Sequence, residues 1–156
     1  MNVNFDNISK NIKENKYGYI GSGSGRLVYD LNNGYVVKKA KNKKGLMQNK
    51  TEYNIASTNH SRILARITAV SDDFNYLIME KADKLKSISE VWKYYDVANF
   101  KELFALEEFK SLSNKNDLLV VDLRRLTSWG LVKGKPVIID FGFTKEVSRL
   151  YNPFRI

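Results

Sequence analysis

The chain has 156 residues, a length that fits one domain and argues against a two-domain enzyme. It has no cysteine and one histidine, His60, which excludes Cys/His zinc sites, disulfides, cysteine nucleophiles and iron–sulfur clusters. The 26 Lys and Arg residues outnumber the 17 Asp and Glu residues, so the formal charge is +9 and an anionic partner is favoured.

The N-terminal part of the chain predicts a helix followed by three antiparallel strands. Over residues 4–14, Phe5, Ile8 and Ile12 recur at helical spacing. Aromatic and β-branched runs then alternate with Gly and Asn turns, and the Asn-Gly pair at 33–34 is a hairpin signal. We therefore expect strands at about 17–21, 26–31 and 35–40.

The rest of the chain predicts a helix, two more strands, a helical region and a short β hairpin. Residues 45–58 have helical periodicity, and residues 63–71 and 76–81 have strand composition on either side of a polar turn. The remaining predicted elements are helices at 89–95 and 100–112 and strands at 118–121, 131–132 and 137–139.

These elements predict an α+β fold in a single domain over residues 1–156. The first ten residues lack the apolar core of a signal peptide, and no apolar run reaches the ~18 residues of a membrane span. We therefore expect a soluble, cytoplasmic protein with no membrane partner. A hydrolase triad would have to use His60, and the chain contains no nucleophile elbow.

A tract of glycine and serine, Gly21-Ser22-Gly23-Ser24-Gly25, lies between two predicted strands. Glycine inside a sheet costs entropy unless another group must approach the backbone closely, as a phosphate chain does. A Rossmann site would need a helix after the glycines, whereas residues 27–29 predict a strand, and the Gly-Lys-Ser/Thr ending of a P-loop is missing. The tract is either a plain loop or a phosphate-binding loop of another kind.

Residues 17–146 resemble the protein-kinase-like superfamily, because several motifs occur in that family's order. Residues 21–28 resemble the phosphate loop Gly-x-Gly-x-x-Gly-x-Val, except that Arg26 replaces the third glycine. Lys38 stands where the lysine of the third strand is expected, and Glu52 where its ion-pair partner is expected on the next helix. Glu80 ends a strand that resembles the one leading to the adenine site.

The second half of the chain continues this resemblance. Asp140-Phe141-Gly142 matches the Asp-Phe-Gly motif, and Asp122, eighteen residues before Asp140, stands where the catalytic-loop aspartate is expected. The sequence Ser-Trp-Gly at 128–130 is similar to the catalytic loop of small bacterial or phage kinase-like proteins.

The resemblance implies a kinase-like N-lobe over about 1–80, with an antiparallel sheet and one helix, and a reduced, mainly helical C-lobe over 81–156 with a catalytic loop and an Asp-Phe-Gly hairpin. It implies Mg-ATP-dependent phosphoryl transfer to a hydroxyl, such as a serine or threonine of a protein. The implied catalytic residues are Asp122 and Lys38, and the implied metal ligands are Asp140 and Ser128. The implied nucleotide-binding residues are Gly21, Ser22, Gly23, Ser24, Gly25, Val28, Lys38, Glu52 and Glu80.

The sequence also departs from the family pattern. Val120 and Val121 stand where His and Arg would precede Asp122, and Thr127 stands at the place of the metal-binding Asn. A hydroxyl is a weaker Mg²⁺ ligand than an Asn carbonyl. Only fourteen residues follow Gly142, so we expect no activation segment and no large helical lobe.

Three functions are consistent with these features. The first is a minimal kinase that binds ATP and Mg²⁺. The second is a kinase-like module without catalysis that contacts a partner protein, which the positive charge suggests is acidic. The third and least favoured is a nucleic-acid binder that uses the five lysines at 38–44 and Trp92, Tyr94 and Tyr95. A second copy of the chain is a further candidate partner, because a reduced lobe can leave apolar surface uncovered.

Overall fold

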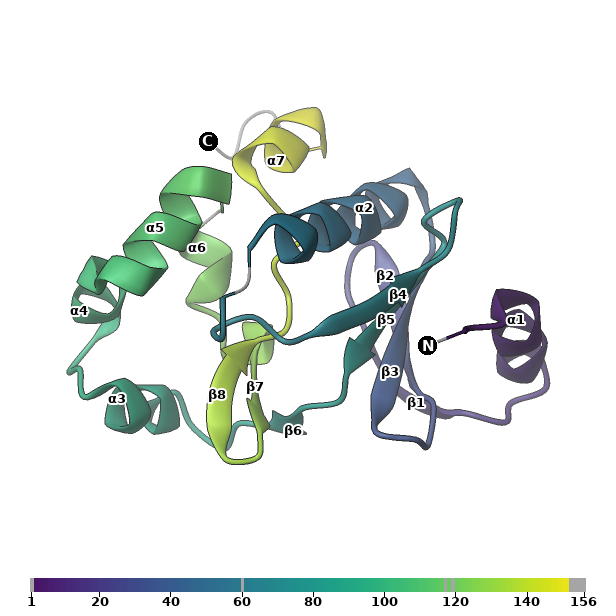
Figure 1. The fold of residues 1–156 in the computed structure, drawn as a ribbon, viewed down its shortest axis with the longest axis horizontal. Coiled ribbons are helices and arrows are strands. Elements are labelled where there is room, and N and C mark those ends of the chain that lie inside the picture. The colour runs from purple at the N-terminus through teal and green to yellow at the C-terminus, as the bar shows by residue number, and fades with distance from the viewer. Residues whose placement is uncertain (1, 60, 117, 119, 152–156) are drawn as a thin grey trace.

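The N-terminal half forms the helix and hairpins that the sequence predicts. The computed structural model describes residues 2–59, 61–116, 118 and 120–151, and Figure 1 shows their arrangement. Helix α1 (Phe5–Lys13) begins at Asn4, whose side chain accepts a hydrogen bond from the Asn7 N–H at 3.0 Å. Strands β1 (Gly18–Ser22), β2 (Arg26–Asp30) and β3 (Tyr35–Ala40) follow as consecutive hairpins.

A five-stranded antiparallel sheet forms the centre of this half. Its strand order is β1-β2-β3-β5-β4, in which β4 covers Ile67–Val70 and β5 covers Tyr76–Glu80. Side chains alternate across the sheet, so neighbouring residues of β3 face opposite sides. Val37 packs with Ile8 and Ile12 of α1, whereas Val36 packs in the cluster that holds Ile55 of helix α2 (Lys43–Thr58). The two helices therefore cover opposite faces of the sheet.

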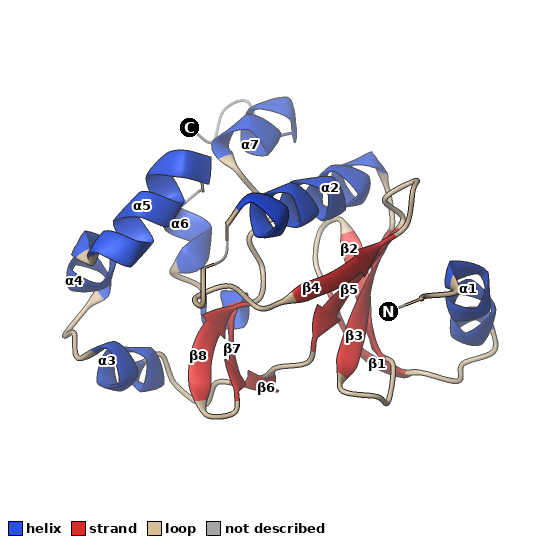
Figure 2. Cartoon of the chain, viewed as in Figure 1, coloured by secondary structure: helices blue, strands red, loops and turns tan. Residues whose placement is uncertain are grey.

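The C-terminal half combines a small sheet with several short helices that lie beside and above it in Figure 2. Strands β6 (Asp83–Lys84), β7 (Trp129–Val132) and β8 (Lys135–Ile138) form an antiparallel sheet in that order. The helical elements are α3 (Ser89–Tyr95), α4 (Phe100–Ala105), α5 (Glu107–Asn116), α6 (Val120–Leu123), the 3₁₀ helix Leu126–Ser128 and α7 (Lys145–Tyr151). Among the helices of the described ranges, none is long and apolar enough to cross a bilayer.

One hydrophobic core joins the two halves. The cluster contains Leu77 and Met79 from the five-stranded sheet together with Leu103, Trp129 and Ile138 from the second half. Backbone hydrogen bonds strengthen the connection, because the Ile138 N–H donates to the Ile63 carbonyl at 2.7 Å and the Ala65 N–H donates to the Ile138 carbonyl at 2.9 Å. The segment before β4 thus holds β8 next to the larger sheet.

The α+β class is confirmed, but two predicted elements are wrong. The predicted helix at 100–112 is divided at Leu106, whose backbone is extended and whose carbonyl accepts the Lys110 N–H in the first turn of α5. This break lets Phe104 and Phe109 meet edge to face, with their ring centroids 6.4 Å apart.

The second error is the strand predicted at 118–121. Leu118 makes an isolated bridge to Thr144, residue 119 lies outside the described residues, and the chain from Val120 onward forms α6. A run of four apolar residues fits a buried strand or a buried helix equally well, so only packing could decide between them. Strand β6 and helix α7 had not been predicted.

Candidate functional site

A cleft of about 620 Å³ lies between the larger sheet and the C-terminal half. Its walls come from the glycine tract, β3, the segment after β5, the α6 region and the segment after β8. Every predicted site residue except Glu52 lines this cleft. They are Gly21, Ser22, Gly23, Ser24, Gly25, Val28, Lys38, Glu80, Asp122, Ser128 and Asp140. The fold therefore brings residues from both halves of the sequence to one cavity.

The glycine tract closes the β1–β2 hairpin over this cleft. The Gly23 N–H donates to the Arg26 carbonyl at 3.0 Å, which makes the turn tight. A Cβ atom added at Gly21 or Gly23 would meet nothing within 4 Å, so the backbone there is open to close approach.

Gly25 lines the cleft and also packs closely against α2. A Cβ at Gly25 would lie 2.3 Å from Oε1 of Gln48, and a Cβ at Gly45 would lie 2.0 Å from the Gly25 carbonyl oxygen. Two glycines are therefore required where the loop contacts α2. The Asn42 side chain adds a hydrogen bond to the Ser24 carbonyl at 3.2 Å. These contacts tie the glycine tract to the first turn of α2.

Lys38 and Glu52 form a buried ion pair behind the cleft. The Lys38 Nζ lies 3.0 Å from Glu52 Oε2 and 3.1 Å from Oε1, and it also donates to the Ile139 carbonyl. The Glu52 side chain is 0% exposed. The predicted pairing between β3 and the next helix is thus present, with Glu52 as an internal partner of Lys38 and not a lining residue.

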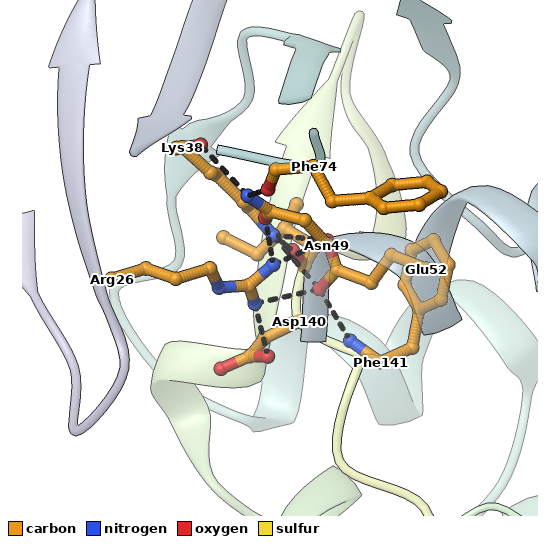
Figure 3. A network of polar contacts seen from close by, with 8 residues as sticks. Arg26, Lys38, Asn49, Glu52, Phe74, Asp140 and Phe141 are labelled. Atoms are coloured by element: carbon orange, nitrogen blue, oxygen red, sulfur yellow. Dashed lines mark hydrogen bonds and ion pairs between the residues drawn. The ribbon is translucent and has the colours of Figure 1, made fainter. Parts of the chain in front are cut away.

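Arg26 is the site residue whose role the sequence analysis missed. Its Nη1 donates to Glu52 Oε2 at 2.8 Å and to Asn49 Oδ1 at 3.1 Å. Its Nη2 donates to Glu52 Oε1 at 2.8 Å and to Asp140 Oδ1 at 3.1 Å, as Figure 3 shows. The guanidinium therefore joins α2 to the segment after β8. The sequence signal was the replacement of a glycine by arginine, which had been treated only as a departure from the motif.

The pKa values of these groups reflect burial opposed by ion pairing. Burial favours the neutral form of Glu52, but Arg26 and Lys38 outweigh it and lower the pKa of Glu52 to about 2. Burial also lowers the pKa of Arg26, but Glu52 and Asp140 outweigh it and leave the pKa raised. The pKa of Lys38 is lowered by burial and by the nearby Arg26, against the opposing effect of Glu52. Glu52 is thus ionised at neutral pH.

The pKa of Glu52 predicts acid sensitivity. The folded pKa of Glu52, about 2, lies below the ordinary value of 4.5. The ionised carboxylate therefore adds its full contribution to the free energy of unfolding above pH 4.5, and this contribution is lost as the pH falls toward 2. That contribution is on the order of 3 kcal/mol. Urea unfolding between pH 6 and pH 3 should show a fall in the free energy of unfolding that is reduced in Glu52→Gln. Asp73→Asn is the control, because Asp73 is an exposed carboxylate whose pKa is lowered by local hydrogen bonds. An equal pH slope in wild type and Glu52→Gln would contradict this assignment.

Asp122 lies on α6 at the far wall of the cleft. Its Oδ1 is 3.3 Å from Nη2 of Arg125, and its side chain is 16% exposed. Its backbone carbonyl accepts a hydrogen bond from the Ser128 Oγ at 2.7 Å. The Ser128 carbonyl accepts the Ile139 N–H at 2.8 Å, so the loop after Asp122 is attached to the chain just before Asp140.

The predicted Mg²⁺ ligands both have partners within the fold. Asp140 is the ion-pair partner of Arg26, and the Ser128 hydroxyl donates its proton to the Asp122 carbonyl. Within the described ranges, no group of three or more His, Asp or Glu side chains is placed to hold a metal ion. The ion pair of Asp140 with Arg26 therefore argues against a metal ion at Asp140, whereas Ser128 as a metal ligand stays a prediction.

Glu80, Trp92 and Tyr95 are also engaged within the fold, whereas Tyr94 is 51% exposed. One carboxylate oxygen of Glu80 accepts the Arg66 N–H at 2.7 Å, although the residue borders the cleft.

The aromatic rings of α3 pack against other rings. The centroid of the Trp92 ring lies 4.5 Å from that of Phe100. The Tyr95 ring lies 5.2 Å from Phe109, and its hydroxyl donates to the Pro136 carbonyl at 3.0 Å. Trp92 and Tyr95 thus pack against other side chains of the fold. This weakens the case for nucleic-acid binding, in which such rings would stack on bases. His60, the one candidate for a triad, lies outside the described residues.

Of the comparisons with known proteins, only the comparison with solved structures found matches. No protein-family model and no curated protein matches the chain. Fifty-nine chains of solved structures match it, and one of them is the aminoglycoside phosphotransferase APH(2″)-IIa, in a ternary complex with streptomycin and ATP. The TM-score is 0.51 and the sequence identity is 16%, over 91% of this chain and 71% of that chain. At this identity the likeness concerns the fold alone, and it shows that the chain has a protein-kinase-like fold.

Proposed function

We propose that this protein binds ATP in the cleft and transfers its terminal phosphoryl group to a hydroxyl, for which a serine or threonine of a protein is our candidate. The observation that carries the proposal is Lys38, which lines one cleft with the open glycine tract and Asp140 and is held from behind by the buried carboxylate of Glu52. A buried lysine that is held by a carboxylate is a fixed positive charge for a phosphate chain.

The lining of the cleft suits a nucleotide. Apolar side chains of the cleft offer walls for a flat base, and they are Val28, Val36, Met79, Leu85, Leu123 and Ile139. The same cleft is lined by the open backbone of Gly21 and Gly23 and by Lys38 and Lys44. Backbone N–H groups and lysines of this kind bind phosphate oxygens. We therefore orient the base toward β5 and the phosphates toward the glycine tract.

Asp122 is our candidate for the base that orients the acceptor hydroxyl. It stands across the cleft from Lys38, in a loop that Ser128 and Trp129 brace, since the Trp129 Nε1 donates to the Leu123 carbonyl at 2.7 Å. A carboxylate within reach of a hydroxyl can accept its proton during transfer. The acceptor molecule would enter on the Asp122 side.

A second candidate function is a nucleotide-binding module that acts on a partner protein without catalysis. The pairing of Asp140 with Arg26 favours it, because this pair engages the carboxylate that the resemblance assigns to the metal. The two functions share the nucleotide site and differ only in whether the phosphoryl group is transferred.

Substitution of Lys38 tests nucleotide binding. We expect Lys38→Met to weaken ATP binding by about tenfold to a hundredfold, because it removes a fixed positive charge that faces the phosphates. Isothermal titration calorimetry and the ATP-induced rise in melting temperature would measure the loss. Lys39→Met is the matched control, since Lys39 is the next residue of β3 and faces the opposite side of the sheet. If wild type shows no ATP binding at millimolar nucleotide, the proposed function is wrong.

A further inference from the structure

Arg26 occupies a position from which it can replace a metal ion. Its guanidinium is 3.1 Å from Asp140 Oδ1, and the arginine is only 6% exposed although it borders the cleft. The Asp140 side chain is 51% exposed, so the carboxylate faces the cleft while its Oδ1 is held from behind by a cation. The charge that a metal would bring to Asp140 is thus already supplied by the chain.

The guanidinium is fixed in this place by buried partners. Glu52 accepts two hydrogen bonds from it at 2.8 Å, and Asn49 accepts one more at 3.1 Å. Asn49 is itself 0% exposed, and its Nδ2 donates to the carbonyls of Phe74 and Lys38 at 2.8 and 3.3 Å. Movement of Arg26 away from Asp140 would break several of these bonds at once. The ion pair is therefore a built part of the site.

The charges of the cluster balance without a metal. Arg26 and Lys38 carry two positive charges, and Glu52 and Asp140 carry two negative charges. A divalent cation bound to Asp140 would lie within a few ångströms of the guanidinium. The positive charges of the metal and of Arg26 would repel each other strongly in a partly buried site.

We propose that the guanidinium of Arg26 takes the place of a divalent cation at Asp140, so that this protein binds the triphosphate of its nucleotide without requiring a metal ion. This inference rests on the proposed nucleotide site. Arg26 acts here as a positioning residue for Asp140 and as a fixed positive charge beside Lys38 for the phosphates. Arginine suits this role, because its planar fork holds a carboxylate while it presents charge to an anion.

The test is the affinity for ATP measured by calorimetry, once in excess EDTA and once in excess MgCl₂. For wild type we expect the two dissociation constants to agree within about threefold, whereas Arg26→Gly, which restores the glycine of the motif, should bind at least about tenfold more tightly with Mg²⁺ than without. Arg62→Gly is the matched control, because it removes an exposed arginine outside the cleft and should behave as wild type.

The outcomes separate the two proposals. If wild type binds ATP with Mg²⁺ but loses about tenfold or more in EDTA, the role of Arg26 is wrong and the nucleotide site stands. If wild type binds under neither condition, both proposals are wrong.

If Arg26→Gly does not fold, a second experiment tests the proposal with proteins that do fold, by the electron paramagnetic resonance signal of free Mn²⁺. Binding of Mn²⁺ to the protein reduces this signal. Without nucleotide, wild type should reduce it no more than Asp140→Asn does, and a reduction that depends on Asp140 would overturn the proposal.

Discussion

The Glu52→Ala variant is expected to lose about 3–5 kcal/mol of the free energy of unfolding, because it leaves buried charges without their partner. Glu52 is the shared acceptor for Arg26 and Lys38, and its Oε1 also accepts the Phe141 N–H at 3.2 Å. Its removal would leave two cations facing each other in the interior and would release the chain after β8. Urea denaturation followed by tryptophan fluorescence would measure the change.

The control for this prediction is a carboxylate in an exposed ion pair. Glu14 lies 2.9 Å from Lys16, and its side chain is 41% exposed. We expect Glu14→Ala to change the free energy of unfolding by less than about 1 kcal/mol, since water screens such pairs. A loss in Glu52→Ala as small as that in Glu14→Ala would mean that the buried network contributes little to stability.

The Asp122→Asn variant is expected to reduce phosphoryl transfer by about 10²–10⁴-fold while it leaves ATP affinity nearly unchanged. An amide has the shape of the carboxylate but cannot accept the proton of the acceptor hydroxyl. Transfer from labelled ATP to the protein itself or to added acceptors would measure the rate, and calorimetry would measure the affinity.

Asp72→Asn serves as the control, because Asp72 is exposed in the turn between β4 and β5, away from the cleft. Equal transfer by wild type and Asp122→Asn would remove Asp122 from the mechanism. Binding of ATP by wild type with no transfer to any acceptor would support the alternative function, a binding module without catalysis.

Much of the fold was predictable, because most elements have local signals. The predicted helices at 4–14, 45–58 and 89–95 agree with α1, α2 and α3 to within about two residues, the accuracy expected at helix ends. The Gly and Asn turns likewise indicated the hairpins of the large sheet. Before α3, the two-residue strand β6 was missed, and the strand predicted at 63–71 is shorter in the structure, where β4 begins at Ile67. The region after α3 was harder, because Leu106 ends a helix without glycine or proline and Leu118–Val121 is too short to show a period.

The candidate site was predictable only in part. Lys38 and Glu52 could be paired before the structure was considered, since both sit in motifs of known order, and the ion pair is present. The phosphate-binding role of Gly25 stays a prediction, but its close packing against Gly45 of α2 could not be predicted, because Gly45 lies on another element. The metal-binding role of Ser128 also stays a prediction, and its hydrogen bond to the Asp122 carbonyl likewise became visible only in the structure.

The sequence by itself determined the α+β class and the glycine tract between two strands, because these depend on patterns among near neighbours. The resemblance of its motifs to those of kinase-like proteins, in the same order, singled out Lys38, Glu52 and Asp140. Only the tertiary structure decided what Arg26 does. Arg26 is 114 residues from Asp140 along the chain, and their contact exists because β2, α2 and the segment after β8 pack around one buried carboxylate, Glu52. A buried arginine must find such a partner, but no local pattern tells which of the 17 carboxylates it will be.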